Sequence, residues 1–262
     1  MNRLSLTIDY AFKKFFVTKP NLLIDFLNAV FRDYDGFTIE SLTIQNPELP
    51  GEAIDDKNAI LDILAKDSNG RAINIEMQAH EIAQFAKRSA FYAFRLYVSG
   101  IEKGENHADI PPVYSINLLD FTLFPGDKYH RCFRILDVGE PVVSMMDDME
   151  FHFVELGKMK SSIAELNDPL EIWTTFIRLS GDLSEEDMQE LKKKNPALQE
   201  AEETLEEISM DSKTRLQYDR RKSALFFYEK TLDKKFAEGK LEGQIETERE
   251  TLLILLESKF GK

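Results

Sequence analysis

Two apolar strands joined by a tight turn constrain the fold more than any other segment of the chain. We expect the strands over residues 57–66 and 71–79, with Asn69-Gly70 in the turn between them. Asn-Gly is among the strongest short-range signals for a β-hairpin. Side chains alternate between the faces of a strand, yet both faces are mostly apolar in this pair. That pattern is typical of central strands covered on both sides, so it predicts a layered α/β fold.

The register of this hairpin decides which side chains share a face. A three-residue loop over 68–70, with Gly70 in the left-handed conformation, pairs residues whose numbers sum to 138. Asp62 then opposes Glu76, with Cβ atoms about 4.5–5.5 Å apart. Gln78 lies two residues further along the same face. A two-residue turn would shift the pairing by one residue and place the two acids on opposite faces.

Two adjacent carboxylates in an apolar setting need compensation, because each costs several kcal/mol when it is removed from water. A divalent cation, a shared proton or a cationic partner supplies that compensation. Mg²⁺ prefers a few carboxylates together with waters and phosphate oxygens. The alternative is that this face of the hairpin is exposed to solvent, as most charged faces are. The apolar neighbours on both faces count against that alternative.

The remaining segments predict one mixed sheet followed by helices. Before the hairpin we expect helices over 7–18 and from residue 20, and a strand over 37–45; after it, a helix over 82–102 and strands over 113–122, 129–136 and 149–156. This order predicts an α/β fold with a mixed central sheet. From about residue 160 the pattern is helical, including one long helix over 222–260. We therefore divide the chain into a domain over 1–160 and a helical region over 161–262, which either packs on the core or mediates self-association.

Three separated motifs carry a resemblance to one bacterial family. They are Asp9-Tyr10-Ala11-Phe12-Lys13-Lys14-Phe15-Phe16, the stretch from Asp56-Lys57 to Leu61-Asp62-Ile63, and Ile73-Asn74-Ile75-Glu76-Met77-Gln78. Over roughly residues 5–156 the chain resembles the Rpn family of recombination-promoting nucleases, also described as transposases. That family belongs to the PD-(D/E)XK nuclease superfamily. The resemblance implies an αβββαβ core and cleavage of phosphodiester bonds that depends on Mg²⁺ or Mn²⁺.

The resemblance also implies roles for individual residues. Asp62 and Glu76 resemble the metal-binding acids of the two hairpin strands, and Asp9 resembles the helical acid that supplements the metal site. A metal held there lowers the pKa of bound water and neutralises charge on the phosphate. Gln78 occupies the position of the lysine in the superfamily's namesake pattern. Its amide orients water by hydrogen bonding, but it lacks the charge with which lysine stabilises an anion.

DNA is the expected partner, and it requires a local basic patch. The chain has 33 Lys and Arg against 47 Asp and Glu, a net charge of −14, so a bulk basic footprint is absent. The candidate patch consists of Lys13, Lys57, Arg88 and Tyr92. Arg88 and Tyr92 are four residues apart on the helix expected over 82–102, which suits a phosphate backbone and a stacked base. An amphipathic helix with a solvated arginine is the alternative.

The single cysteine, Cys132, and the four histidines exclude an internal disulfide and a cysteine-rich structural zinc site. We expect Cys132 to be a small buried hydrophobe, and the histidines show no metal-ligand spacing. With no signal-peptide pattern, the cysteine usage predicts a cytoplasmic location. No apolar stretch reaches 18 residues, so we expect no membrane span. The partly heptad-like pattern near the C-terminus makes a homodimer through these helices a hypothesis.

Two functions of different classes stay open at this point. The first is a metal-dependent DNA endonuclease associated, through the resemblance, with recombination or transposition. The second is a non-catalytic interaction protein on a nuclease fold, acting through partners of its helical tail. Gln78 and the acidic net charge favour the second, whereas the acids Asp9, Asp62 and Glu76 favour the first. A nuclease acting on RNA is a third, weaker alternative. The core does not separate DNA from RNA as the substrate, because no RNA-binding signature is visible.

Overall fold

The computed structural model describes residues 3–32, 34, 38–45, 63–82, 84–159, 161–231, 234, 240 and 246. The chain divides into two compact units, Met1–Tyr218 and Asp219–Lys262. Lys57 and Asp62 lie outside the described residues, and so does most of the segment expected to form the C-terminal heptads. In the second unit, residues 219–231 are helical. No helix in the described part of the chain is long and apolar enough to cross a membrane.

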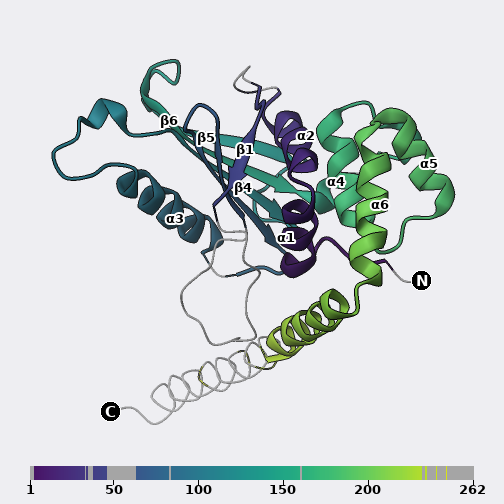
Figure 1. The fold of residues 1–262 in the computed structure, drawn as a ribbon. Helices are drawn as coiled ribbons and strands as arrows, with labels where there is room; N and C mark the ends of the chain where they lie inside the picture. Colours follow the sequence, from purple (N-terminus) through teal and green to yellow (C-terminus); the bar gives the residue numbers. More distant parts are fainter. Residues whose placement is uncertain are drawn as a thin grey trace, which may run out of the picture. The chain divides into compact units, whose positions relative to one another are not determined.

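A mixed six-stranded sheet lies at the centre of the first unit, with the strand order β1-β2-β3-β4-β6-β5 (Figure 1). The strands are β1 (Leu42–Ile44), β2 (Ile63–Asp67), β3 (Ala72–Gln78), β4 (Val113–Leu119), β5 (His130–Leu136) and β6 (Ser144–Glu155). β4 runs parallel to both β3 and β6, and the other neighbours are antiparallel. The predicted α/β fold with a mixed sheet is confirmed. β6 begins at Ser144 rather than at Met149, where the strand was expected to start.

The turn chemistry fixes the register of β2 and β3, which is the register expected from the sequence. The partners are Ile63↔Ile75, Leu64↔Asn74, Ala65↔Ile73 and Lys66↔Ala72, so the residue numbers of each pair sum to 138. Gly70 has a φ of +84°, and the N–H of Asp67 donates to the carbonyl of Arg71 at 3.2 Å across a three-residue loop. The Asp67 carboxylate accepts hydrogen bonds from the N–H groups of Asn69 and Arg71 at 3.0 and 2.9 Å. It also pairs with the Arg71 guanidinium at 2.5 Å.

Helices cover both faces of the sheet. They are α1 (Asp9–Thr18) and α2 (Pro20–Phe31), which precede β1, and α3 (Phe85–Ser99), which lies between β3 and β4. Phe31 at the end of α2 packs against Tyr114 of β4, with ring centroids 5.2 Å apart. The hydroxyl oxygens of Ser89 in α3 and Ser115 in β4 lie 3.2 Å apart. Because Tyr114 and Ser115 are consecutive in one strand, α2 and α3 cover opposite faces; Figure 1 shows them on either side of the sheet.

Three more helices complete the first unit: the first and the third pack on α1 and α2, and the second packs on the other two. They are α4 (Pro169–Leu179), α5 (Glu185–Lys194) and α6 (Ala197–Met210). The ring of Trp173 in α4 lies 6.2 Å from that of Phe16 and 6.1 Å from that of Phe26, and its indole N–H donates to Asp25 at 2.6 Å. The N–H of Leu4 donates to Ser209 of α6 at 3.0 Å. The first compact unit therefore continues to Tyr218, and the composition shift near residue 160 does not coincide with its edge.

Candidate functional site

Glu76 lies in a row of buried polar side chains on the face of the sheet that α3 covers. In the parallel register of β3 and β4, Asn74 pairs with Ser115 and Glu76 pairs with Asn117. Ser115 contacts α3, and side chains two residues apart share a face. Glu76 is only 5% exposed, and Asn74, Ser115 and Asn117 are fully buried. This row places polar side chains among the buried apolar residues of the sheet.

The electrostatics of Glu76 depend on its burial and on one cation. Burial raises the pKa of the Glu76 carboxyl, and the positive charge of Arg88 partly opposes that shift. Arg88 projects from the first half of α3, and its guanidinium carbon lies 5.7 Å from the centroid of the Tyr92 ring. Its Nε is buried and has no hydrogen-bond partner among the described residues. Sheet and helix thus bring a buried carboxylate and a buried guanidinium nitrogen into one region.

Gln78 is the last residue of β3, where the strand leaves the core. Its amide nitrogen donates to the carbonyl oxygen of His80 at 3.1 Å. The main-chain carbonyl of Gln78 accepts a hydrogen bond from the N–H of Asp120, the first residue after β4, at 3.0 Å. Loss of hydration raises the pKa of Asp120, whereas Arg178 and His80 lower it. Sequence patterns gave no signal for Asp120, because its proximity follows from the parallel pairing of β3 with β4.

The two candidate residues of α1 have different surroundings. Asp9 begins the helix, where its carboxylate accepts from the N–H of Tyr10 at 2.8 Å. Lys13 is only 1% exposed. Such burial does not fit the expectation that Lys13 contributes to a basic patch on the surface, because one face of α1 packs into the core. A phosphate backbone reaches exposed cations, so Lys13 is withdrawn from the proposed DNA contacts.

The structure therefore brings some predicted site residues together and leaves others undecided. Glu76 and Arg88 interact, Gln78 lies on the strand of Glu76, and Tyr92 lies one turn beyond Arg88. The buried amides of Asn74 and Asn117 are members of the site that the sequence analysis missed. Strand alternation also places Asn74 on the same face as Glu76. Asn74 and Asn117 are uncharged, so neither stands out in the sequence as a candidate site residue.

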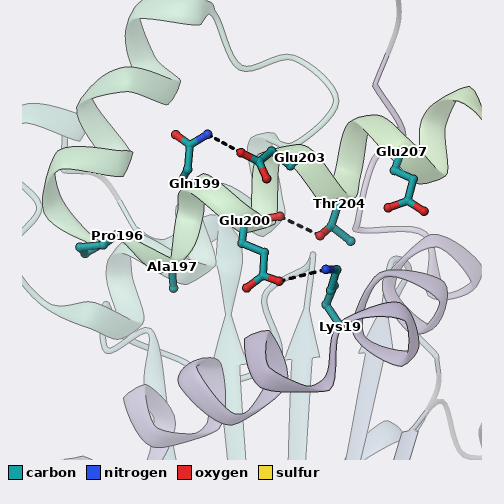
Figure 2. Close-up of a pocket in the computed structure, with 8 residues that line it drawn as sticks. All are labelled: Lys19, Pro196, Ala197, Gln199, Glu200, Glu203, Thr204 and Glu207. Atoms are coloured by element: carbon teal, nitrogen blue, oxygen red, sulfur yellow. Dashed lines mark hydrogen bonds and ion pairs between the residues drawn. The ribbon is translucent and has the colours of Figure 1, made fainter.

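A pocket beside α6 offers a different kind of surface (Figure 2). It is lined by Lys19, Pro196, Ala197, Gln199, Glu200, Glu203, Thr204 and Glu207. Lys19 Nζ lies 3.1 Å from a carboxylate oxygen of Glu200, and Gln199 donates to Glu203 at 2.8 Å. None of the predicted site residues lines this pocket, and its acidic character does not suit a phosphate ligand.

Comparison with known proteins identifies a family to which the chain is similar. The family model described as PD-(D/E)XK nuclease family transposase matches residues 6–235. No curated protein matches the chain, and no solved structure does. The matched range includes the hairpin, α3 and also α4–α6, so it extends past residue 160, as the compact unit does. The chain therefore belongs to the PD-(D/E)XK nuclease family transposases.

Proposed function

We propose that the protein is a metal-dependent endonuclease that hydrolyses phosphodiester bonds in DNA, in the context of recombination or transposition. The observation that carries the proposal is the buried Glu76 carboxylate beside Arg88, on the third strand of a chain that belongs to a nuclease family. Glu76 resembles the acid that the (D/E) in this family name denotes. DNA is the substrate class that a transposase family implies.

The residues around Glu76 fit a hard divalent cation. Burial raises the pKa of Glu76, which means that the carboxylate lacks hydration and gains from a bound cation. The side-chain oxygens of Asn74 and Asn117 are buried and have no hydrogen-bond partner among the described residues. Carboxylate and amide oxygens are donors suited to Mg²⁺ or Mn²⁺, either directly or through waters. We propose Glu76 and Asp62 as the holding acids, with Asp9 as the supplementary acid.

The protein's own side chains would position the substrate and the water. A bound divalent ion supplies a water of lowered pKa and neutralises charge on the phosphate. Arg88 places a positive charge beside the carboxylate and attracts the phosphate backbone, while the Tyr92 ring offers a stacking surface. Because Gln78 Nε2 donates to the His80 carbonyl, its Oε1 is the atom that accepts a hydrogen bond from a water and orients it. Lys57 is retained as a proposed DNA contact.

Plasmid nicking with Mg²⁺ or Mn²⁺ tests the proposal. We expect wild-type protein to nick supercoiled DNA and Glu76→Gln to be at least about 100-fold slower, because the amide removes the anionic ligand. Glu76→Gln purified in the same way controls for a contaminating nuclease. Glu203→Gln, an exchange of the same kind in the pocket of Figure 2, controls for the exchange itself and should match wild type. Circular dichroism verifies the fold of each variant. Equal nicking by all three proteins would contradict the assignment of Glu76.

A non-catalytic interaction protein is the second candidate, and Gln78 is the observation that favours it. Glutamine cannot stabilise a developing anion by charge, as a lysine at this position does. If wild type does not cut DNA or RNA and calorimetry detects no binding of Mg²⁺ or Mn²⁺, this second function replaces the first. Cutting of RNA alone would keep the reaction and change the substrate class.

A further inference from the structure

A second group of metal-ligating side chains lies on the face of the sheet opposite Glu76. It consists of Cys132 on β5 and Glu150 and His152 on β6, here named the β5–β6 cluster. Cys132 and His152 are cross-strand partners in the antiparallel register, and Glu150 precedes His152 by two residues on the same face. Phe31 of α2 packs edge-on against His152, with centroids 5.3 Å apart. The cluster therefore lies under α2, while the Glu76 row lies under α3.

The ligand atoms of the cluster converge as the ligands of one small ion do. Cys132 Sγ lies 3.8 Å from His152 Nε2, and His152 Nε2 lies 3.0 Å from Glu150 Oε2. All three atoms lie within 4.8 Å of one another. Zinc binds sulfur at about 2.3 Å and nitrogen or oxygen at about 2.0–2.2 Å in a tetrahedron, which separates neighbouring ligand atoms by roughly 3.3–3.6 Å. Shifts of a few tenths of an ångström bring the sulfur–nitrogen pair and the nitrogen–oxygen pair to that separation.

The surroundings of the cluster also orient its ligands. The second ring nitrogen of His152, Nδ1, lies 3.0 Å from Nε2 of His130. The second oxygen of Glu150 forms an ion pair with the guanidinium Nε of Arg134. Metal-binding histidines and carboxylates characteristically have such partners, which hold the ring and the carboxylate in a binding orientation. Glu150 and His152 thus each present one atom to the cluster and have their other polar atom engaged elsewhere.

We propose that the β5–β6 cluster binds a zinc-class transition-metal ion through Cys132 Sγ, Glu150 Oε2 and His152 Nε2, with water as the fourth ligand. The thiolate and imidazole select a softer ion than the oxygen donors around Glu76, so this site is separate from the proposed nuclease centre. The anionic thiolate and carboxylate neutralise the charge of the dication. Glu150 and His152 are buried, whereas Cys132 is partly exposed, which leaves a path for the ion. The ion would join β5, the edge strand, to β6.

Cobalt titration of the metal-free, full-length protein tests this site. Co²⁺ bound by a thiolate gives a sulfur-to-metal charge-transfer band, and we expect that band to saturate at one equivalent and to disappear when Zn²⁺ is added. Cys132→Ser should remove the band and weaken Zn²⁺ binding by at least about 10-fold. Because Cys132 is partly exposed, this variant is expected to fold, and circular dichroism verifies that.

Two further proteins separate this site from its alternatives. Glu76→Gln should keep the charge-transfer band at wild-type strength, which shows that the ion is not at the nuclease centre. Glu150→Gln should weaken Zn²⁺ binding while the thiolate band persists at higher Co²⁺ concentration. The proposal is overturned if stoichiometric Co²⁺ gives no charge-transfer band, or if the band persists unchanged in Cys132→Ser. The three side chains would then form only a buried hydrogen-bonded group.

Discussion

At the scale of single residues, the proposed chemistry of this protein depends on how burial and charge combine at Glu76. Burial alone disfavours the ionised carboxylate, and Arg88 offsets part of that cost. An acid in this balance gains more from a further cation than an exposed acid does, because low-dielectric surroundings strengthen the attraction. Arg88 differs from a solvated surface cation, because its Nε is buried and has no hydrogen-bond partner among the described residues.

Replacing Arg88 tests whether its charge acts at the site. We expect Arg88→Gln to slow DNA cleavage at saturating DNA by about 10-fold or more, because positioned charge beside a reacting phosphate stabilises the transition state. It should also reduce the salt dependence of DNA binding by about one phosphate contact. Nicking rates and binding measured across salt concentrations check both effects.

Arg95→Gln is the matched control for this prediction. Arg95 lies two turns further along α3, is exposed, and has its guanidinium carbon 5.9 Å from the centroid of the Phe91 ring. It carries the same charge, but Arg88 is the cation that lowers the pKa of Glu76. We expect this variant to change DNA binding at most and to leave the rate at saturating DNA intact. Equal losses of rate in the two variants would deny Arg88 a specific role.

Strand alternation and charge allowed part of the site to be predicted from sequence. Strand alternation assigns Glu76 and Gln78 to one face, and the turn residues predict the pairing register that β2 and β3 have. The burial of Lys13 was not foreseen, because a lysine normally points to solvent and only the tertiary packing of α1 overrides that tendency. Cys132 and His152 are twenty positions apart, so their proximity follows from the β5–β6 register rather than from any motif spacing.

At the scale of elements, turn chemistry decides the position of Glu76 along the hairpin. Gly70 has a φ of +84°, and a Cβ added there would meet only Lys66 Cε at 3.8 Å. Gly70→Ala therefore tests backbone conformation without a steric clash. We expect a loss of about 1–2 kcal/mol in the free energy of unfolding, and a lower melting temperature, by roughly 2–4 °C per kcal/mol.

Gly157→Ala provides the comparison for the hairpin prediction. A Cβ at Gly157 meets nothing within 4 Å, and its φ is not in the left-handed region. We expect its melting temperature to match that of wild type or to rise by about 1–4 °C, since the substitution only reduces the freedom of the unfolded chain. Thermal unfolding followed by circular dichroism measures both variants. If Gly70→Ala and Gly157→Ala had the same melting temperature, the expected backbone strain of alanine at position 70 would be absent.

A pH effect is expected where α2 meets α6. Hydrogen bonds from Lys19 and Asn21 hold the pKa of the Glu200 carboxyl below its ordinary value. The folded protein therefore keeps this carboxylate ionised at pH values where the unfolded chain has already bound a proton. Its stabilisation is present above pH 4.5, the ordinary pKa, and is lost as the pH falls further. Because both side chains are exposed, we expect Glu200→Gln to cost less than about 1 kcal/mol at pH 7.

Urea unfolding at pH 7 and near pH 3 checks this sign. The difference between wild type and Glu200→Gln should be present at pH 7 and shrink as the pH falls below 4.5 and the wild-type carboxyl takes up a proton. Glu203→Gln is the control, because Glu203 accepts from Gln199 within α6 and does not join α6 to α2. A difference that persists undiminished at pH 3 would assign the effect to packing rather than to charge.

At the scale of the whole molecule, α4–α6 belong to the same compact unit as the sheet and do not form a separate domain after it. Phe15 of α1 is fully buried, and its ring lies 6.0 Å from that of Phe176 in α4. At the other end of the unit, the N–H of Ser5 donates to the hydroxyl of Tyr218 at 3.2 Å. Composition changes near residue 160 because solvent-facing charge increases there. The apolar residues that α4–α6 direct toward α1 and α2 occur at helical spacing, and composition alone does not reveal their partner.

Truncation distinguishes the boundary seen in the structure from the one expected at residue 160. A chain of residues 1–160 loses the helices that cover α1 and α2, so aromatic side chains that are fully buried become exposed. Exposed apolar surface of that kind leads to loss of fixed packing and to aggregation. We therefore expect residues 1–160 to bind a hydrophobic dye and to melt without a cooperative transition, whereas residues 1–218 should unfold cooperatively.

The chain's single tryptophan makes the longer truncation informative about packing as well as about secondary structure. Trp173 projects from α4 and packs against Phe16 of α1 and Phe26 of α2. Its fluorescence therefore reports the docking of α4. In residues 1–218 the fluorescence and circular dichroism transitions should coincide, since a cooperative unit loses all its contacts together. If fluorescence changed first, α4 would separate before the sheet unfolds. Cooperative unfolding of residues 1–160 would show that the sheet and its three flanking helices suffice for a fold.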